Sequence, residues 1–248
     1  AVSFGLPQLT GPYLTAALML VIAVTVLQLF LRPDPYLLAR SVAAEASGIT
    51  LPRPSLRDGL EHLRRHRRAV LGVSSVALGH VVMVMVMVMT PVHMRHVDVS
   101  LQLIGLVISV HVLGMYAFSP VVGWLVDRFG RVPMIFVGAG ILLAACVISG
   151  LAPSDNVPAL AVGLFLLGLG WSFTLIAGST LVSDDVEENE RPSVQGLSDL
   201  CMNLAAAVGG AVAGFIVAGA SYAVLCAVAV VPVLILVALA ASPAMRRP

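Results

Sequence analysis

The sequence contains no lysine at all, and charged residues of any kind make up only 11% of its 248 positions. About a quarter of a soluble domain is charged, whereas 59% of this chain is apolar. A single globule of this size cannot bury that much apolar surface, so the solvent of the folded chain must itself be apolar. The formal net charge of +1 also gives no basis for nucleic-acid binding.

Cysteine is nearly absent as well, and Cys146, Cys201 and Cys226 each lie inside a long apolar run. Their spacing matches no metal site, and thiols in such surroundings are usually small packing residues. The hydrolase motifs HExxH and GxSxG are missing, and no two carboxylates are paired within an apolar run. The sequence therefore predicts no enzyme, no cofactor and no metal site.

Seven apolar stretches are long enough to cross a bilayer core, which takes about 20 helical residues. They predict an all-α membrane protein, a polytopic bundle of seven transmembrane helices. The run Val82–Met89 alternates like a strand, but it lies inside a much longer apolar stretch, which favours helix. Pro232 predicts a kink in the last helix. The predicted spans are residues 12–32, 69–90, 101–124, 133–151, 159–182, 194–219 and 222–242.

Arginine is distributed very unequally between the two sides of these spans. Thirteen of the fourteen basic residues fall on one side, and only Arg95 falls on the other. Because cytoplasmic loops are enriched in positive residues, we expect a multi-pass protein of the plasma membrane (the bacterial inner membrane). Its amino terminus would lie outside and its carboxy terminus in the cytoplasm.

The long cytoplasmic stretch 33–68 is predicted to be a linker that contains a short amphipathic helix. Ser55 and Asp58 have the spacing of a capping box at the start of that helix. One face would carry leucines and the other arginines, so the helix would lie along the anionic inner leaflet. A solvated basic tether is the alternative. The residues concerned are Leu56, Leu60 and Leu63, against Arg57, Arg64 and Arg65.

The segment GWLVDRFGR, between the third and fourth spans, places five residues in a pattern with a physical reading. Gly123 allows two helices to approach closely, and Gly130 allows a tight turn. Asp127 can accept hydrogen bonds at the amino-terminal end of a neighbouring helix. Arg128 and Arg131 can bind carboxylates or lipid phosphates. Together they form a candidate gating motif on the cytoplasmic side.

This segment resembles the Gly-x-x-x-Asp-Arg-x-Gly-Arg signature of the major facilitator superfamily of transporters. The family carries it between its second and third helices, with a weaker copy between its eighth and ninth. Val132 stands where the family often has another basic residue, which suits the weaker copy. The stretches His111–Tyr116 before Pro120 and Glu190–Asp199 are similar to the end of the family's eighth helix and the approach to its eleventh.

The resemblance covers nearly the whole chain and aligns its spans with the family's sixth to twelfth helices. Residues 1–32 would be the outer segment and sixth helix, residues 33–68 the linker, and residues 69–248 the carboxy-terminal half of six helices. The amino-terminal half of the same polypeptide would then be missing, and Asp127 would lack its docking helix. The implied partners are the lipid bilayer, a small-molecule solute and that missing half.

Ionisable side chains inside apolar spans are costly and often functional, which singles out His80, His111 and Asp199. Histidine can relay protons, although a neutral imidazole bonded to a neighbouring helix is the alternative for both histidines. For Asp199, the alternative is an interfacial carboxylate that reaches Arg191 or Arg131. These three side chains are candidates for the solute or proton pathway.

Other polar and aromatic residues extend the list of pathway candidates. Gln102, Ser109 and Tyr116 share one face of the third span, which could line a cavity. His111 lies nearly opposite Ser109, so both cannot face the same pore. Trp171 and Thr174 are one turn apart in the fifth span, where they would either contact solute or pack.

Two further patterns are interpreted structurally. His93, Met94, His96 and Asp98 combine soft and imidazole ligands, as copper sites do, but the neighbouring methionines alternate between helix faces and form no ligand stripe. Small residues recur every fourth position in the sixth span, which predicts close helix packing there and suits a helix that slides during transport. That stripe is Ala206, Gly210, Gly214 and Ala218.

The resemblance implies secondary active transport of a small solute by alternating access. Such transport is commonly proton-coupled in the family, and drug or metabolite efflux is one form of it. The main alternative is a seven-helix receptor or sensor without transport activity. A retinal protein is excluded because it needs a Schiff-base lysine, and the long arginine-rich loop disfavours a ligand receptor.

Overall fold

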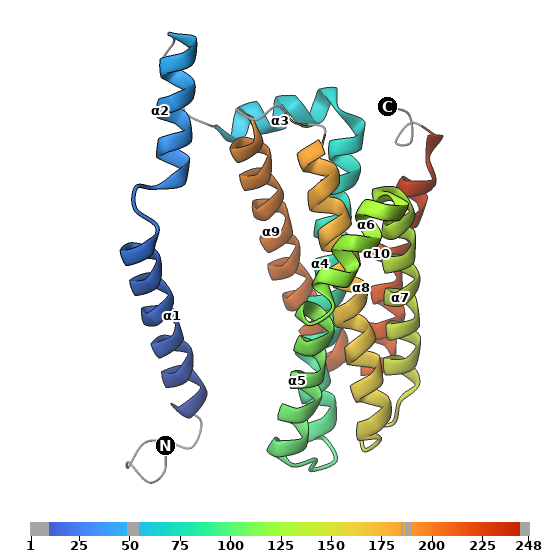
Figure 1. The fold of residues 1–248 in the computed structure, drawn as a ribbon. Coiled ribbons are helices and arrows are strands. Elements are labelled where there is room, and N and C mark those ends of the chain that lie inside the picture. The colour runs from blue at the N-terminus through green and yellow to red at the C-terminus, as the bar shows by residue number, and fades with distance from the viewer. Residues whose placement is uncertain (1–9, 49–54, 185, 187–189, 244–248) are drawn as a thin grey trace. The chain divides into compact units, whose positions relative to one another are not determined.

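The computed structural model describes residues 10–48, 55–184, 186 and 190–243. These residues form ten helices and no strand (Figure 1). Seven stretches are long and apolar enough to cross a membrane, which confirms the predicted all-α membrane fold. The chain divides into two compact units, residues 1–53 and 54–248, and each is described by itself.

The first unit contains α1 (Thr10–Phe30) and α2 (Pro35–Ser47). The side chains of α1 are exposed from Tyr13 to Phe30, as expected of a helix whose apolar surface is left to lipid. Asp34 caps α2 by accepting hydrogen bonds from the backbone N–H groups of Tyr36 and Leu37. The first span was predicted over residues 12–32, so the helix starts and ends two residues earlier than expected.

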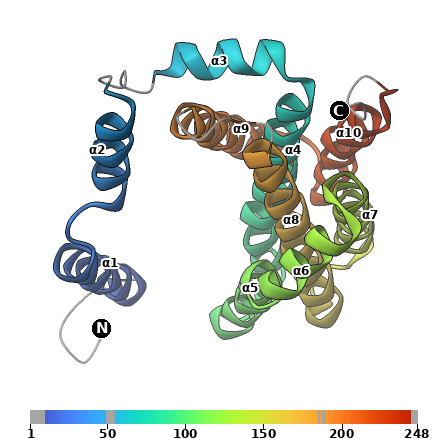
Figure 2. The same ribbon diagram turned by 45° about the horizontal axis from the view of Figure 1, so that its top comes forward.

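The second unit is a helical bundle organised around α8. Helix α8 packs along α4, α5 and α7, and α4 also packs against α9 and α10, an arrangement that Figure 2 shows in an oblique view with the top of the bundle turned forward. The main core consists of apolar side chains from these helices. The helices are α3 (Leu56–Arg65), α4 (Arg67–Arg95), α5 (Leu101–Tyr116), α6 (Ser119–Phe129), α7 (Arg131–Leu151), α8 (Val157–Asp184), α9 (Arg191–Gly219) and α10 (Tyr222–Ala241).

The third predicted span, residues 101–124, is broken rather than continuous. Helix α5 ends at Tyr116 and α6 begins at Ser119. Pro120 lies in the first turn of α6, and proline has no N–H to bond the carbonyl four residues earlier. Ser119 instead donates its hydroxyl to the carbonyl of Met115. The apolar stretch still runs from Leu101 to Phe129.

Helices α5 and α8 approach closely at glycine. A Cβ atom at Gly114 would overlap the carbonyl oxygen of Phe165, and one at Gly168 would overlap that of His111. Backbones that come this near gain dispersion contacts that lipid cannot supply. The shared surface holds α5 against the central helix.

The small-residue stripe predicted on α9 is only partly the surface that packs, since a Cβ atom at Gly210 would lie 3.6 Å from the Val84 side chain in α4. A Cβ atom at Gly214 would have no atom of another helix within 4 Å, whereas one at Gly209 would collide with the side chain of Val81 in α4. Ala213, one turn on from Gly209, is fully buried. Helix α9 is therefore rotated so that a neighbouring row of small residues faces α4, which four-residue spacing alone does not distinguish.

Helix α3 starts with the predicted capping box: the Ser55 hydroxyl accepts from the Asp58 N–H, and the Asp58 carboxylate accepts from the Ser55 N–H. Figure 1 shows α3 lying across the end of the bundle, where it contacts α9 and α4. Gly59 and His62 are buried, while Leu56 and Leu60 are exposed. Of the three leucines predicted to share one face, Leu63 therefore packs on the bundle, while Leu56 and Leu60 do not.

Candidate functional site

The main candidate site joins three helices through His80, Trp171 and Tyr116. Trp171 of α8 donates its indole N–H to Nδ1 of His80 in α4 over 2.8 Å. The ring of Tyr116, at the end of α5, meets the Trp171 ring edge to face, with 5.9 Å between the centroids. Trp171 is 5% exposed and Tyr116 is 59% exposed, so the cluster runs from the core to the surface.

The hydrogen bond from Trp171 fixes the protonation of His80. Indole N–H is only a donor, so Nδ1 of His80 must be an acceptor and the imidazole is neutral, with its proton on Nε2. In imidazolium both ring nitrogens are donors. Proton uptake by His80 would therefore break this bond between α4 and α8.

Thr174, one turn after Trp171, belongs to the packing between α4 and α8. Its side chain is fully buried, and its hydroxyl donates to the Trp171 carbonyl at 2.9 Å. Ser75 of α4 donates to the Thr174 carbonyl, also at 2.9 Å. A Cβ atom at Gly79 would overlap the Thr174 side chain, so no space remains beside this hydroxyl for a solute.

His111 is fully buried and bridges α5 to α8. Its Nδ1 lies 2.8 Å from the carbonyl oxygen of Leu164, which requires an N–H on Nδ1. Gln102 and Ser109 are exposed on α5, and the Ser109 hydroxyl donates to the carbonyl of Gly105. The structure thus separates His111 from the face that carries Gln102, Ser109 and Tyr116.

A polar row on α9 contains Asp199 and a residue that the sequence analysis missed. The Asp199 carboxylate accepts from the Gln195 amide over 3.1 Å, and the Asn203 amide donates to the Asp199 carbonyl over 2.7 Å. Asp199 and Asn203 are exposed. The four-residue spacing of these side chains would have placed Asn203 on the face of Asp199. Among the described residues, Asp199 makes no ion pair with Arg191 or Arg131.

The candidate gating motif forms the turn from α6 to α7. Gly130 adopts a φ of 90°, a conformation that glycine reaches without strain, so the expected tight turn is present. Arg131 donates from Nε to Asp184 at the end of α8 over 2.7 Å and from a terminal nitrogen over 3.4 Å. This forked contact ties the loop to the end of the central helix.

The remaining motif residues make few contacts in this chain. Asp127 is 74% exposed, and its nearest cation is Arg131 at 3.7 Å. The Arg128 guanidinium lies 5.8 Å from the Trp124 ring centroid. A Cβ atom at Gly123 would have no neighbour within 4 Å among the described residues, so no other helix of this half approaches there.

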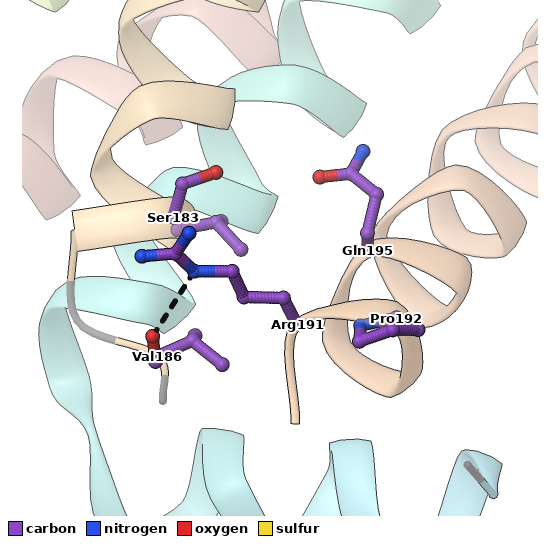
Figure 3. Close-up of a pocket in the computed structure, with 6 residues that line it drawn as sticks. Ser183, Val186, Arg191, Pro192 and Gln195 are labelled. Carbon is purple, nitrogen blue, oxygen red and sulfur yellow. Dashed lines mark hydrogen bonds between the residues drawn. The ribbon is translucent and has the colours of Figure 1, made fainter. Parts of the chain in front are cut away.

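A cavity of about 290 Å³ lies where α8 ends and α9 begins, at the same end of the bundle as the motif. Figure 3 shows Arg191 reaching back from α9 toward α8, with Gln195 on the other side. The Arg191 Nε donates to the Val186 carbonyl over 3.3 Å. Gln195 also donates to Asp199, so the cavity lies next to the polar row on α9.

His93 and His96, at the end of α4, lie beside an aromatic residue of α10. His93 stacks on Tyr222 of α10 with 4.4 Å between ring centroids, and the Tyr222 hydroxyl lies 2.8 Å from that of Thr90. His93 and His96 line a cavity of about 380 Å³. In the described part of the chain, no three His, Cys, Asp or Glu side chains converge as metal ligands.

Comparison with known proteins identifies the family. The Major Facilitator Superfamily matches residues 75–248. The uncharacterised transporters of this type YdeG and YddS from Bacillus subtilis are 41% and 36% identical over 222 and 225 residues, in each case 90% of this chain and 51% of the relative. The riboflavin transporter RfnT from Brucella anthropi is 32% identical over 143 residues, which are 58% of this chain and 35% of that protein.

The chain spans about half the length of the first two relatives. Its helical bundle and its seven apolar stretches are those of a multi-pass membrane protein. The chain therefore belongs to the major facilitator superfamily and corresponds to the carboxy-terminal half of one of its transporters.

Proposed function

We propose that this chain forms the carboxy-terminal half of a secondary transporter that moves a small solute by alternating access. The solute pathway would run along the surface that carries Tyr116 of α5 and Asp199 of α9. Both side chains are exposed in this half. In the complete protein, they would face the amino-terminal half, because transporters of this kind build their site between two halves.

The hydrogen bond between His80 and Trp171 carries the proposal that transport is proton-coupled. A proton on His80 removes the acceptor for the Trp171 N–H, so the α4–α8 contact differs between the two protonation states. Protonation of His80 would therefore alter the binding of a solute that packs on the Trp171 and Tyr116 rings. His111 serves the coupling less well, because its bond to the Leu164 carbonyl exists in both states.

The substrate class follows from the side chains at the cluster. Two aromatic rings with a neutral imidazole suit a planar, amphipathic metabolite better than a small ion. Riboflavin, the solute in the name of one relative, has these properties and is the first solute to test. The direction of transport, uptake or efflux, is a second result of the same assay.

We further propose that the protein lies in the plasma membrane with its carboxy terminus in the cytoplasm. The arginine distribution supports this orientation. The end of the bundle that carries α3, the motif and the Arg191 cavity would then be cytoplasmic. Residues 33–68 would connect the two halves, and the coding sequence upstream of Ala1 would supply five more spans.

The test is transport by both halves together, reconstituted in vesicles with an imposed pH gradient. Riboflavin fluorescence measures solute accumulation, and a pH-sensitive dye measures proton movement. We expect riboflavin to accumulate only with the gradient, and protons to move when riboflavin is added. Proton movement with another metabolite would keep the mechanism but change the substrate. Accumulation that ignores the gradient would exclude proton coupling.

A further inference from the structure

Helix α3 is a separate feature whose role does not depend on transport. It ends at Arg65, and the membrane-spanning helix α4 begins at Arg67. Only His66 separates them, and its extended backbone turns the chain sharply. Both views show α3 lying across the end of the bundle (Figures 1 and 2). Its distance from the membrane boundary is therefore set by a single residue.

The contacts of α3 with α9 fix which way its faces point. A Cβ atom at Gly59 would lie 2.8 Å from the Ser193 carbonyl oxygen, so the two helices touch through backbone. His62 is bonded to Glu190, and Leu63 packs on the small core formed by Val73, Val182, Val186 and Val194. The helix is attached along this face and is not a free tether.

The neighbouring face of α3 is apolar and is not covered by the bundle. Leu56 and Leu60 are one helical turn apart, and they are 53% and 47% exposed. Arg57 and Arg64 follow them around the helix and are also exposed. An apolar strip edged by guanidinium groups at a membrane boundary matches an interfacial helix, with leucine among acyl chains and arginine on phosphate.

We propose that α3 is a docking surface for anionic phospholipid. Leu56 and Leu60 enter the boundary between headgroups and acyl chains, and Arg57 and Arg64 bind lipid phosphates in the forked geometry that guanidinium allows. Because α3 is attached to the start of α9, lipid bound there also holds the end of α9. Two observations select lipid as the occupant: the direct continuation of α3 into a spanning helix, and the positive edge of the strip.

The experiment places a fluorescent reporter on the strip. Leu60→Trp puts an indole at an exposed position, and the parent chain, with its two native tryptophans, provides the baseline. Both chains are reconstituted in vesicles of phosphatidylcholine and phosphatidylglycerol. Bromine, which quenches indole on contact, is carried on the acyl chains of one lipid or the other. We expect both brominated lipids to quench the added indole, and brominated phosphatidylglycerol to quench it more strongly at equal mole fraction.

Charge removal then separates a specific surface from general attraction. At low salt, each of Arg57→Gln and Arg64→Gln should reduce the preference for phosphatidylglycerol roughly fivefold. Arg65→Gln is the matched control, because it removes the same charge from the far side of α3, where Arg65 pairs with Glu61. The control should keep the preference.

Three results would overturn the proposal. An indole that neither brominated lipid quenches would place α3 outside the bilayer and leave its apolar strip to water or to another protein. Equal quenching by both lipids at low salt would remove the anionic preference. A loss with Arg65→Gln as large as that with Arg57→Gln would show diffuse electrostatic attraction in place of a built surface.

Discussion

The imidazole Nδ1 of His62 in α3 lies 2.8 Å from a carboxylate oxygen of Glu190, the residue that directly precedes α9. His62 is 5% exposed, and its ring also stacks on His66 with 4.0 Å between centroids. This contact joins α3 to the start of α9, although the two residues are 128 positions apart in the chain. It makes α3 part of the bundle.

Loss of the His62 side chain should loosen α3 selectively. In His62→Ala, the buried bond to Glu190 disappears, at a cost of about 1–3 kcal/mol, so amide hydrogen exchange should accelerate in residues 56–65. His66→Ala is the comparison, since it removes the ring stacked on His62 but leaves the bond to Glu190, and it should have the smaller effect. Unchanged exchange in His62→Ala would mean that the Gly59 contact alone holds α3.

Substitution of the ionisable span residues should identify the coupling site. With both halves present, we expect His80→Ala to abolish gradient-driven transport while solute exchange without a gradient survives. Trp171→Phe removes the N–H donor of the same hydrogen bond while keeping an aromatic ring, and it should weaken the pH dependence in the same direction. Equivalent measurements on His111→Ala and Asp199→Asn complete the set. If all four variants keep wild-type pH dependence, coupling lies in the other half or does not exist.

The close contact of α5 with α8 predicts that alanine destabilises the protein at one glycine of α5 but not at another. Gly114→Ala forces a methyl group onto the Phe165 backbone and should cost about 1–3 kcal/mol. Gly105→Ala meets no atom within 4 Å and should be neutral or stabilise the helix by up to about 1 kcal/mol. Thermal unfolding of the detergent-solubilised chain measures both. Equal melting temperatures would contradict the packing described for α5.

The fork between Arg131 and Asp184 should contribute modestly to stability, because both side chains are partly exposed. Arg131→Gln is expected to cost about 0.5–1 kcal/mol, and Arg131→Lys to restore only part of it, since an ammonium group cannot make the two parallel bonds. A double-mutant cycle with Asp184→Asn isolates the pair. Arg128→Gln is the control for charge alone, and a loss of the same size there would assign the effect to net charge.

Membrane orientation can be measured with single cysteines in a variant that lacks Cys146, Cys201 and Cys226. Asn156→Cys, in the turn between α7 and α8, should react with an impermeant thiol reagent added to intact cells. Ser47→Cys, at the end of α2, should react only after the membrane is opened. The reverse pattern would place the Asp127–Arg131 turn outside the cell.

Features that depend on solvent or on neighbours within a turn were predictable from the sequence. Apolar length and charge content require a lipid solvent whatever the tertiary arrangement, and the seven spans follow from them. The capping box of Ser55 and Asp58 involves residues three apart, so it forms wherever that helix starts. The turn at Gly130 is equally local, and the signature around it identified the family.

Which side of each helix faces its neighbours was decided only in the tertiary structure. Soluble helices show their buried side as an apolar stripe, but a helix surrounded by lipid is apolar on every side, and little in its pattern marks the packed face. For this reason the row predicted on α9 includes Gly214, which meets no other helix, and misses the closest contact with α4, at Gly209. The break between α5 and α6 has another cause. The span was predicted from apolar length alone, and Pro120, which starts a new helix there, does not shorten the apolar stretch.

The chemistry of the candidate site also depends on which side of each helix faces its neighbours. His80 and Trp171 are 91 residues apart in the chain, and nothing local indicates that one accepts a hydrogen bond from the other. His111 carries the same side chain in an equally apolar run, yet it faces α8 and bonds a backbone carbonyl. The sequence by itself determined that this protein lies in a membrane, that it has seven spans and which side chains are ionisable. Only the packing of α4, α5 and α8 decided which histidine can change partners on protonation, because a hydrogen bond requires both groups to be on facing surfaces.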